Sequence, residues 1–200
     1  RWGLALRRRW RLRRRWRLGT VVMAIDTLAH HRRTWRVLWR HLWLDEHDAQ
    51  RLLGPAGLAR LTERVRASEA HHLGEIRVCI EAALPLRRLL AGSTPRQRAV
   101  ELFKRLGVGR TVGRNGVLVY LLVADQAIEI VVDPALHAAL PPDHWQTVVD
   151  LMQQHLGAGA VEQGLLAALD RVDAMLTQRV PAGVPGGTNP NELPDEPLLL

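Results

Sequence analysis

The pattern of hydrophobic and polar positions predicts one α/β domain between about residues 45 and 180. Residues 75–83 alternate apolar and polar side chains, which indicates a strand with one buried face. Residues 117–123 are apolar without interruption, which favours a central strand covered on both faces. Alternation resumes at Ile128 after a short turn, so these two strands are expected to form an antiparallel hairpin.

Helical spacing of apolar residues surrounds these strands, at about 55–72, 95–106, 143–156 and 160–179. The second of these helices begins with a capping box, in which Thr94 and Gln97 satisfy backbone groups of the first turn. The order α, β, α, β, β, α, α predicts a mixed β-sheet with helices on its faces. The last residues, 181–200, are rich in proline and glycine and are expected to be a disordered tail.

The net charge of +8 belongs to the N-terminal segment and not to this domain. Residues 1–22 hold nine of the 28 basic residues and no acidic one, which leaves 19 basic residues against 20 acidic ones. A nucleic-acid partner is therefore not indicated for the domain. The chain opens on Arg1 and its first methionine is Met23, so we interpret this basic Arg/Trp segment as a start-site artefact or part of a fragment.

Residues 27–43 predict a basic amphipathic helix with an apolar stripe of Trp35, Leu38, Trp39 and Leu42. Such a helix lies at a membrane interface or packs on the domain or a partner helix, and the sequence leaves both open. No window has the length and hydropathy of a membrane span, and the basic segment lacks the form of a signal peptide. The expected location is cytoplasmic or peripheral to the inner membrane.

Several stretches, in their order and spacing, resemble the TPM domain family. They are Ser68–Glu69 with His72, Gly74–Val78, Asn115–Leu118, Ala124–Asp125 with Ile128–Val131, Trp145, and Asn191–Asp195. The resemblance covers about residues 45–195 and is strongest to a short, signal-less bacterial branch. It implies an α/β/α sandwich. Relatives occur at membranes or as accessory subunits, some bind divalent metal, and acid phosphatase activity is attributed to one of them.

One loop departs from the family pattern. Related sequences carry an acidic, Trp-containing loop before the Asn–Gly step, whereas residues 107–114 contain two Arg and no carboxylate. Arginine opposes the binding of a cation at this loop. The same loop, with Arg110, Arg114 and Asn115, is instead a candidate anion site.

Candidate metal ligands are the carboxylates Glu75, Asp125 and Asp133, which lie at or near predicted strand ends. Ca²⁺ or Mg²⁺ held there would activate water against a phosphate ester, so a metal-dependent acid phosphatase-like hydrolase is the alternative function. Adjacent histidines on a helix diverge, which argues against a metal site at the His71–His72 pair, but His72 stays an outside candidate because it belongs to the stretches that resemble the family. Turn chemistry explains Asp125 equally well.

Nucleophilic chemistry has little support in the sequence. Cys79 lies in the middle of a strand, where an inert thiol is typical, and no nucleophile-elbow pattern surrounds Ser68 or Ser93. Without a coherent catalytic set, we expect a non-enzymatic module that binds a protein partner or associates with a membrane surface.

Overall fold

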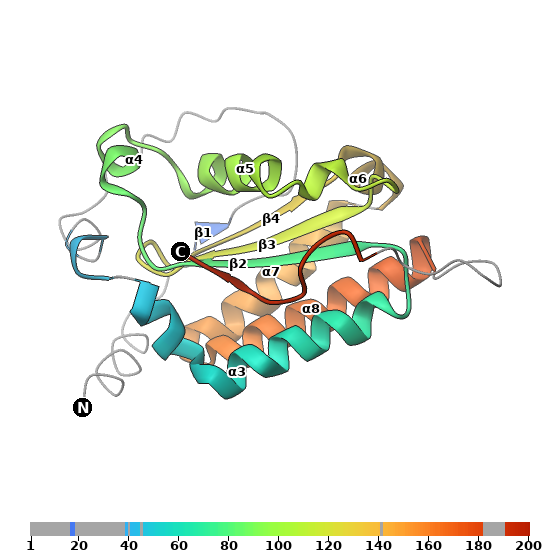
Figure 1. The fold of residues 1–200 in the computed structure, drawn as a ribbon, viewed down its shortest axis with the longest axis horizontal. Coiled ribbons are helices and arrows are strands. Elements are labelled where there is room, and N and C mark those ends of the chain that lie inside the picture. The colour runs from blue at the N-terminus through green and yellow to red at the C-terminus, as the bar shows by residue number, and fades with distance from the viewer. Residues whose placement is uncertain (1–16, 19–38, 40, 45, 141, 182–190) are drawn as a thin grey trace.

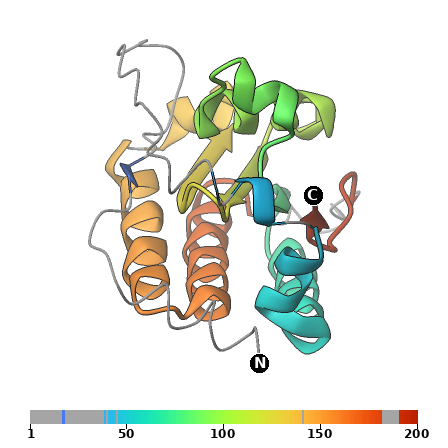
Figure 2. The ribbon, with the colours of Figure 1, turned by 90° about the vertical axis from the view of Figure 1, so that its left-hand side faces the viewer.

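The computed structural model describes residues 17–18, 39, 41–44, 46–140, 142–181 and 191–200, drawn as a coloured ribbon in Figure 1. A β-sheet lies between two layers of helices. One face is covered by α3 (Glu46–Glu69), α7 (Pro142–Gly157) and α8 (Val161–Arg179), and Figure 2 shows these three helices side by side below the sheet. The other face is covered by α5 (Pro95–Arg105). The predicted α/β/α sandwich is confirmed.

Three full strands form the middle of the sheet: β2 (Glu75–Glu81), β3 (Gly116–Leu122) and β4 (Ala127–Val132). β2 and β3 are parallel, whereas β3 and β4 form the predicted antiparallel hairpin, so the sheet is mixed. Two-residue strands complete the order β1-β4-β3-β2-β5, with β1 (Arg17–Leu18) and β5 (Leu198–Leu199) at the edges.

The prediction that β2 has only one buried face is wrong, because every residue of this strand is buried. Its apolar residues face α3 and α8, while Arg77, Cys79 and Glu81 face the α5 layer. The Glu81 carboxylate is accommodated in this buried position because the Arg98 guanidinium makes three hydrogen bonds with it, the shortest at 2.7 Å. The alternation therefore reflects a buried polar face and not a solvated one.

Local signals placed the helix boundaries well. The Thr94 side chain accepts a hydrogen bond from the Gln97 backbone at 3.1 Å, and the Gln97 side chain accepts one from the Thr94 backbone at 2.9 Å, as the capping box requires. Gly54 adopts φ 68°, ψ 169°, so the helix axis breaks there and restarts at Pro55. Three further elements are short: α4 (Leu86–Leu90), η1 (Val108–Arg110) and α6 (Pro134–Ala139).

The prediction of a disordered tail is wrong for residues 191–200, which lie along the free edge of β2. Leu198 pairs with Cys79, and the Leu200 backbone N–H donates to the Ile80 carbonyl at 3.0 Å. The Arg77 guanidinium donates to the Pro194 carbonyl at 2.6 Å. Proline excludes helix and central strand, but it does not prevent an extended segment from docking at a sheet edge. The remainder of the predicted tail, residues 182–190, lies outside the described residues.

Most of the N-terminal predictions also lie outside the described residues. Of the predicted helix at 27–43, residues 39 and 41–43 are described, and they are helical. Trp35 and Leu38 are not described, and the start-site hypothesis for residues 1–22 stays a hypothesis. None of the described helices combines the length and the hydropathy that crossing a membrane requires.

Candidate functional site

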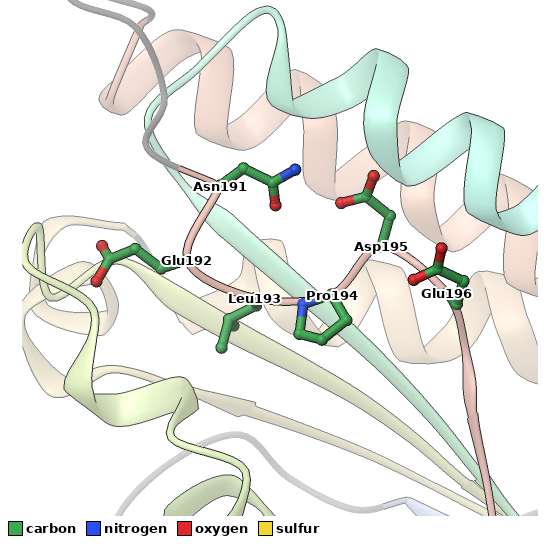
Figure 3. Close-up of a pocket in the computed structure, with 6 residues that line it drawn as sticks. All are labelled: Asn191, Glu192, Leu193, Pro194, Asp195 and Glu196. Carbon is green, nitrogen blue, oxygen red and sulfur yellow. The ribbon is translucent and has the colours of Figure 1, made fainter.

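Two ends of the sheet are candidates for function. β2 and β3 are parallel and in register, with Glu75 opposite Gly116, so both strands begin at the same end. The C-terminal end of α3 and the loop 191–196 meet them there (Figure 3). We call this region the polar end; it comprises Glu69, His72, Glu75, Asn115, Glu192 and Asp195.

Several polar side chains at the polar end form hydrogen bonds with backbone groups. The Asn115 amide donates to the Leu73 carbonyl at 2.6 Å, which ties the loop before β3 to the loop before β2. One Glu75 carboxylate oxygen accepts from the Leu193 N–H at 3.1 Å, and Glu69 accepts from the Ile76 N–H at 3.0 Å. These side chains therefore fasten three chain segments to one another.

Carboxylates crowd the interior of the polar end. Glu69, Glu75 and Asp195 are each at most 7% exposed. Burial raises the pKa of Glu69 to about 8, and the nearby charges of Glu75 and Asp195 add to this effect. Burial likewise raises the pKa of Glu75, one of whose oxygens has no hydrogen-bond partner among the described residues. Arg66 supplies positive charge at 3.2 Å from Asp195, on a side chain 58% exposed.

A shallow pocket of about 370 Å³ opens beside this loop, lined by Asn191, Glu192, Leu193, Pro194, Asp195 and Glu196. Figure 3 shows Asn191 and Asp195 directed toward α3, while Glu192 points to the other side of the loop. The Glu192 carboxylate accepts the Val112 N–H at 2.9 Å, and the Asn191 amide nitrogen donates to Asp195 at 3.3 Å. The polar side chains of the pocket wall thus support the loop.

A serine, a histidine and an aspartate also meet near the polar end, but their arrangement excludes general-base catalysis by the histidine. The His72 Nδ1 accepts the Gly74 N–H at 3.1 Å, so the neutral ring carries its proton on Nε2. That Nε2 lies 2.9 Å from the Ser68 hydroxyl and 3.6 Å from Asp173. Burial lowers the pKa of His72, which keeps the ring neutral. With no lone pair facing Ser68, His72 cannot take the serine proton.

The three predicted metal ligands do not converge. Glu75 starts β2 and Asp133 follows β4, so both flank Gly116 at the polar end. Asp133 caps α6 by accepting the Ala135 N–H at 2.9 Å. Asp125 lies in the β3–β4 turn, at the opposite end of the sheet. In the described part of the chain, no three His, Cys, Asp or Glu side chains are placed to bind one metal ion.

The predicted anion loop is dispersed. Arg110 ends η1 and is exposed, and Arg114 is a left-handed residue (φ 49°) whose Nε lies 3.9 Å from Asp133. The Asn115 amide nitrogen donates to the Leu73 carbonyl, as described above. The structure therefore gives Arg114 and Asn115 local partners, and Arg110 is exposed.

The opposite end of the sheet is different in character, because it exposes apolar side chains. Six large hydrophobic residues are exposed in the described part of the chain. Five of them lie at this end, which we call the apolar end: Trp39 (53%), Leu42 (57%), Trp43 (76%), Leu86 (57%) and Leu90 (79%). Val112, at 87%, lies at the polar end beside Glu192. Exposed apolar residues that gather at one end of a protein favour an interaction site there.

A buried histidine fixes the apolar end. The His41 Nδ1 accepts the Leu84 N–H at 3.0 Å, and its Nε2 lies 2.8 Å from Asp125. With Nδ1 accepting, Nε2 carries the proton and donates to the Asp125 carboxylate. One side chain thereby holds residues 39–44 against the chain that leads into α4 and against the β3–β4 turn, and Figure 1 shows α4 and residues 41–44 at this same end. The predicted metal ligand Asp125 is thus an anchor for the apolar end.

Spacing along the helix accounts for the exposed face. Trp39, Leu42 and Trp43 stand at i, i+3 and i+4, and the two indole rings stack with centroids 6.5 Å apart. Leu86 and Leu90, also four residues apart, face solvent on α4 while Leu89 is buried. Sequence analysis predicted Trp39 and Leu42 for this surface and missed Trp43, Leu86 and Leu90. The run Leu86–Leu90, in which two arginines lie between leucines, was the sequence feature that could have indicated the exposed leucines.

Comparison with known proteins agrees with the fold. A family model, the TPM domain, matches residues 47–175. A similar solved structure is the NMR structure of the BA42 protein from the psychrophilic bacterium Bizionia argentinensis, at 25% identity and a TM-score of 0.63. That match covers 73% of this chain and 94% of the other. No curated protein matches. The chain is a member of the TPM domain family, as its sequence motifs predicted.

Proposed function

We propose that this protein is a non-enzymatic TPM module that binds a partner surface through its apolar end. The observation that carries the proposal is the concentration of exposed Trp and Leu side chains at one end of an otherwise well-packed sandwich. Burying apolar surface that a monomer leaves in water is the main favourable term in association. Two of the exposed residues are tryptophans, and tryptophan is enriched among the interface residues that contribute most of the binding energy.

Three features of the structure support a non-enzymatic role. The side chains of the polar end form hydrogen bonds with the backbone of neighbouring loops. They therefore stabilise the loops, whereas a catalytic group would face substrate. Ser68 and His72 have the wrong proton arrangement for a nucleophile and its base. Of the three predicted metal ligands, Asp125 lies at the opposite end of the sheet from Glu75 and Asp133.

A site-specific photocross-linker tests the binding surface. Benzophenone-alanine in place of Leu90 is expected to give one adduct of defined mass when cells are irradiated. The same residue in place of Val112, which is equally apolar and exposed at the polar end, is the matched control and is expected to give none. Equal adducts at both positions would contradict a dedicated surface at the apolar end.

Enzyme activity is tested separately with p-nitrophenyl phosphate. The full chain is expected to release no p-nitrophenol above the buffer rate with Ca²⁺, with Mg²⁺ or without metal. Turnover that requires one of these metals, stops on adding chelator and is lost in Glu75→Gln would overturn the non-enzymatic proposal and favour the phosphatase.

A further inference from the structure

The outer edge of β2 holds an extended peptide, the C-terminal segment of residues 191–200 (Figure 1). Its last residues pair with the strand in parallel, and the Arg77 guanidinium donates to the carbonyls of Pro194 and Glu196. We infer that this edge is a binding site for an extended peptide of a partner protein, which displaces the chain's own segment 191–200. This site lies apart from the apolar end, so the inference goes beyond the proposed function.

The contacts of segment 191–200 are those of a displaceable strand. β5 pairs two residues with β2, in the parallel arrangement that is the less stable one per residue. Within the segment, Leu193 and Asp195 are buried and residues 197–200 are half-buried, whereas every residue of β3 is buried. The pocket of about 370 Å³ lined by residues 191–196 leaves this part loosely packed. Segments with few buried contacts open locally at low free energy.

The segment is also held at an electrostatic cost. It brings Asp195 close to Glu69 and Glu75, and all three side chains are at most 7% exposed. Burial, with a contribution from the charge of Asp195, raises the pKa of both glutamates. Positive charge comes from Arg66, which is 3.2 Å from Asp195 but 58% exposed, and from Arg77. A peptide with an uncharged side chain at the Asp195 position would bind with less repulsion.

A second copy of this chain is a poor occupant of the edge. Its segment 191–200 would make the same contacts, with the same repulsion from Glu69 and Glu75, as the segment already in place. The segment in place also has the advantage of being part of the same chain, which raises its effective concentration at the site. A different protein, whose peptide lacks the third carboxylate, can overcome that advantage.

The contacts of the segment also define the peptide that the site takes. Leu193 is 6% exposed in the core cluster shared with α5, and its N–H donates to the Glu75 carboxylate at 3.1 Å. The bonds from Arg77 to two carbonyls require an extended backbone and select no side chain. The Glu192 carboxylate accepts the Val112 N–H at 2.9 Å. We therefore expect an extended segment with an acidic residue directly before a leucine, added to the sheet as an edge strand.

The test is fluorescence anisotropy of the full chain with a labelled peptide, residues 191–200 carrying Asp195→Asn. The chain's own segment competes, so binding to the unaltered protein should be weak. Leu193→Ser in the protein removes the buried leucine of the competing segment, and the peptide should then bind about tenfold tighter. The same peptide with serine at the position of Leu193 is the matched control and should bind neither protein.

Two further measurements locate the binding. In the Leu193→Ser protein, Arg77→Gln should weaken binding of the peptide by about tenfold, because the bonds to two carbonyls are lost. Thermal unfolding verifies that each variant is folded. In the unaltered protein, hydrogen exchange should show the N–H groups of residues 198–200 protected about a hundredfold less than those of residues 117–122 in β3.

Equal protection of residues 198–200 and of β3 would overturn the inference, because the segment would then be a permanent strand. The same conclusion follows if the peptide does not bind the Leu193→Ser protein, or if it binds the unaltered protein equally well. Equal binding of the leucine and serine peptides would also overturn the inference. None of these results depends on the cross-link at position 90, so failure here is distinguishable from failure of the proposed function.

Discussion

Glu69→Gln is expected to remove a large part of the pH dependence of stability. Glu69 is 5% exposed, and one of its oxygens accepts the Ile76 N–H at 3.0 Å. Glutamine keeps that acceptor and has nearly the same volume, so the substitution removes chiefly the titration. The pKa of Glu69 is raised by burial from 4.5 to about 8.

The sign follows from proton linkage. Between pH 4.5 and about 8 the folded protein holds a proton on Glu69 that the unfolded chain has released. Stability from this group is therefore fully present below pH 4.5 and is lost as pH rises through about 8. A displacement of one pKa unit corresponds to about 1.4 kcal/mol, so the free energy of unfolding should fall by roughly 3 kcal/mol between about pH 5 and about pH 7. The neighbouring charges of Glu75 and Asp195 contribute to the raised pKa of Glu69.

Urea unfolding at several pH values, followed by tryptophan fluorescence, measures this effect. The difference between Glu69→Gln and the unaltered protein should grow in favour of the variant as pH rises. Glu63→Gln is the control on the same helix, because that side chain is 71% exposed and pairs only loosely with Arg66 at 3.4 Å. Parallel pH profiles for the unaltered protein and Glu69→Gln would refute the reasoning.

Three further predictions have defined outcomes. Arg98→Ala leaves the Glu81 carboxylate, 1% exposed, without its guanidinium, and should cost about 3–5 kcal/mol in urea unfolding; an unchanged midpoint would contradict a buried pair. Gly116→Ala would place a Cβ 2.0 Å from a backbone oxygen of η1 and should cost about 3 kcal/mol, against about 1 kcal/mol for Gly92→Ala, whose Cβ meets open space. Burial raises the pKa of Cys79 to about 12, so its thiol should resist a neutral-pH thiol reagent until the protein unfolds, and rapid native labelling would disprove this.

The strands and main helices were predictable because their signals are local. A continuous apolar run identified β3, and the capping box identified the start of α5 within one residue. The burial of the second face of β2 was not predictable from alternation. Arg77 and Glu81 look solvated in the sequence, and the burial of Glu81 depends on hydrogen bonds from Arg98, 17 residues away, and from Tyr120.

The candidate sites show a second limit. Position at a strand end does not say which end of the sheet a residue occupies. Because β3 and β4 are antiparallel, the turn that carries Asp125 and the strand end that carries Asp133 point to opposite ends. The apolar end was only half predicted, because the link between residue 41 and residue 84 spans 43 positions and has no periodic signal.

The C-terminal segment also covers part of one edge of the sheet. A sheet edge with unpaired N–H and C=O groups is a template for adding strands from other molecules. Residues 198–200 pair with Cys79 and Ile80 of β2 and with Ala82, which follows the strand. Backbone groups at this part of the edge are therefore already hydrogen-bonded within the protein. A chain cut after Pro181 would expose the outer edge of β2 to other copies. Sheet-to-sheet aggregation, and not loss of the helical layers, is the failure that such truncation should produce, so the proline-rich C-terminus acts as a safeguard of solubility.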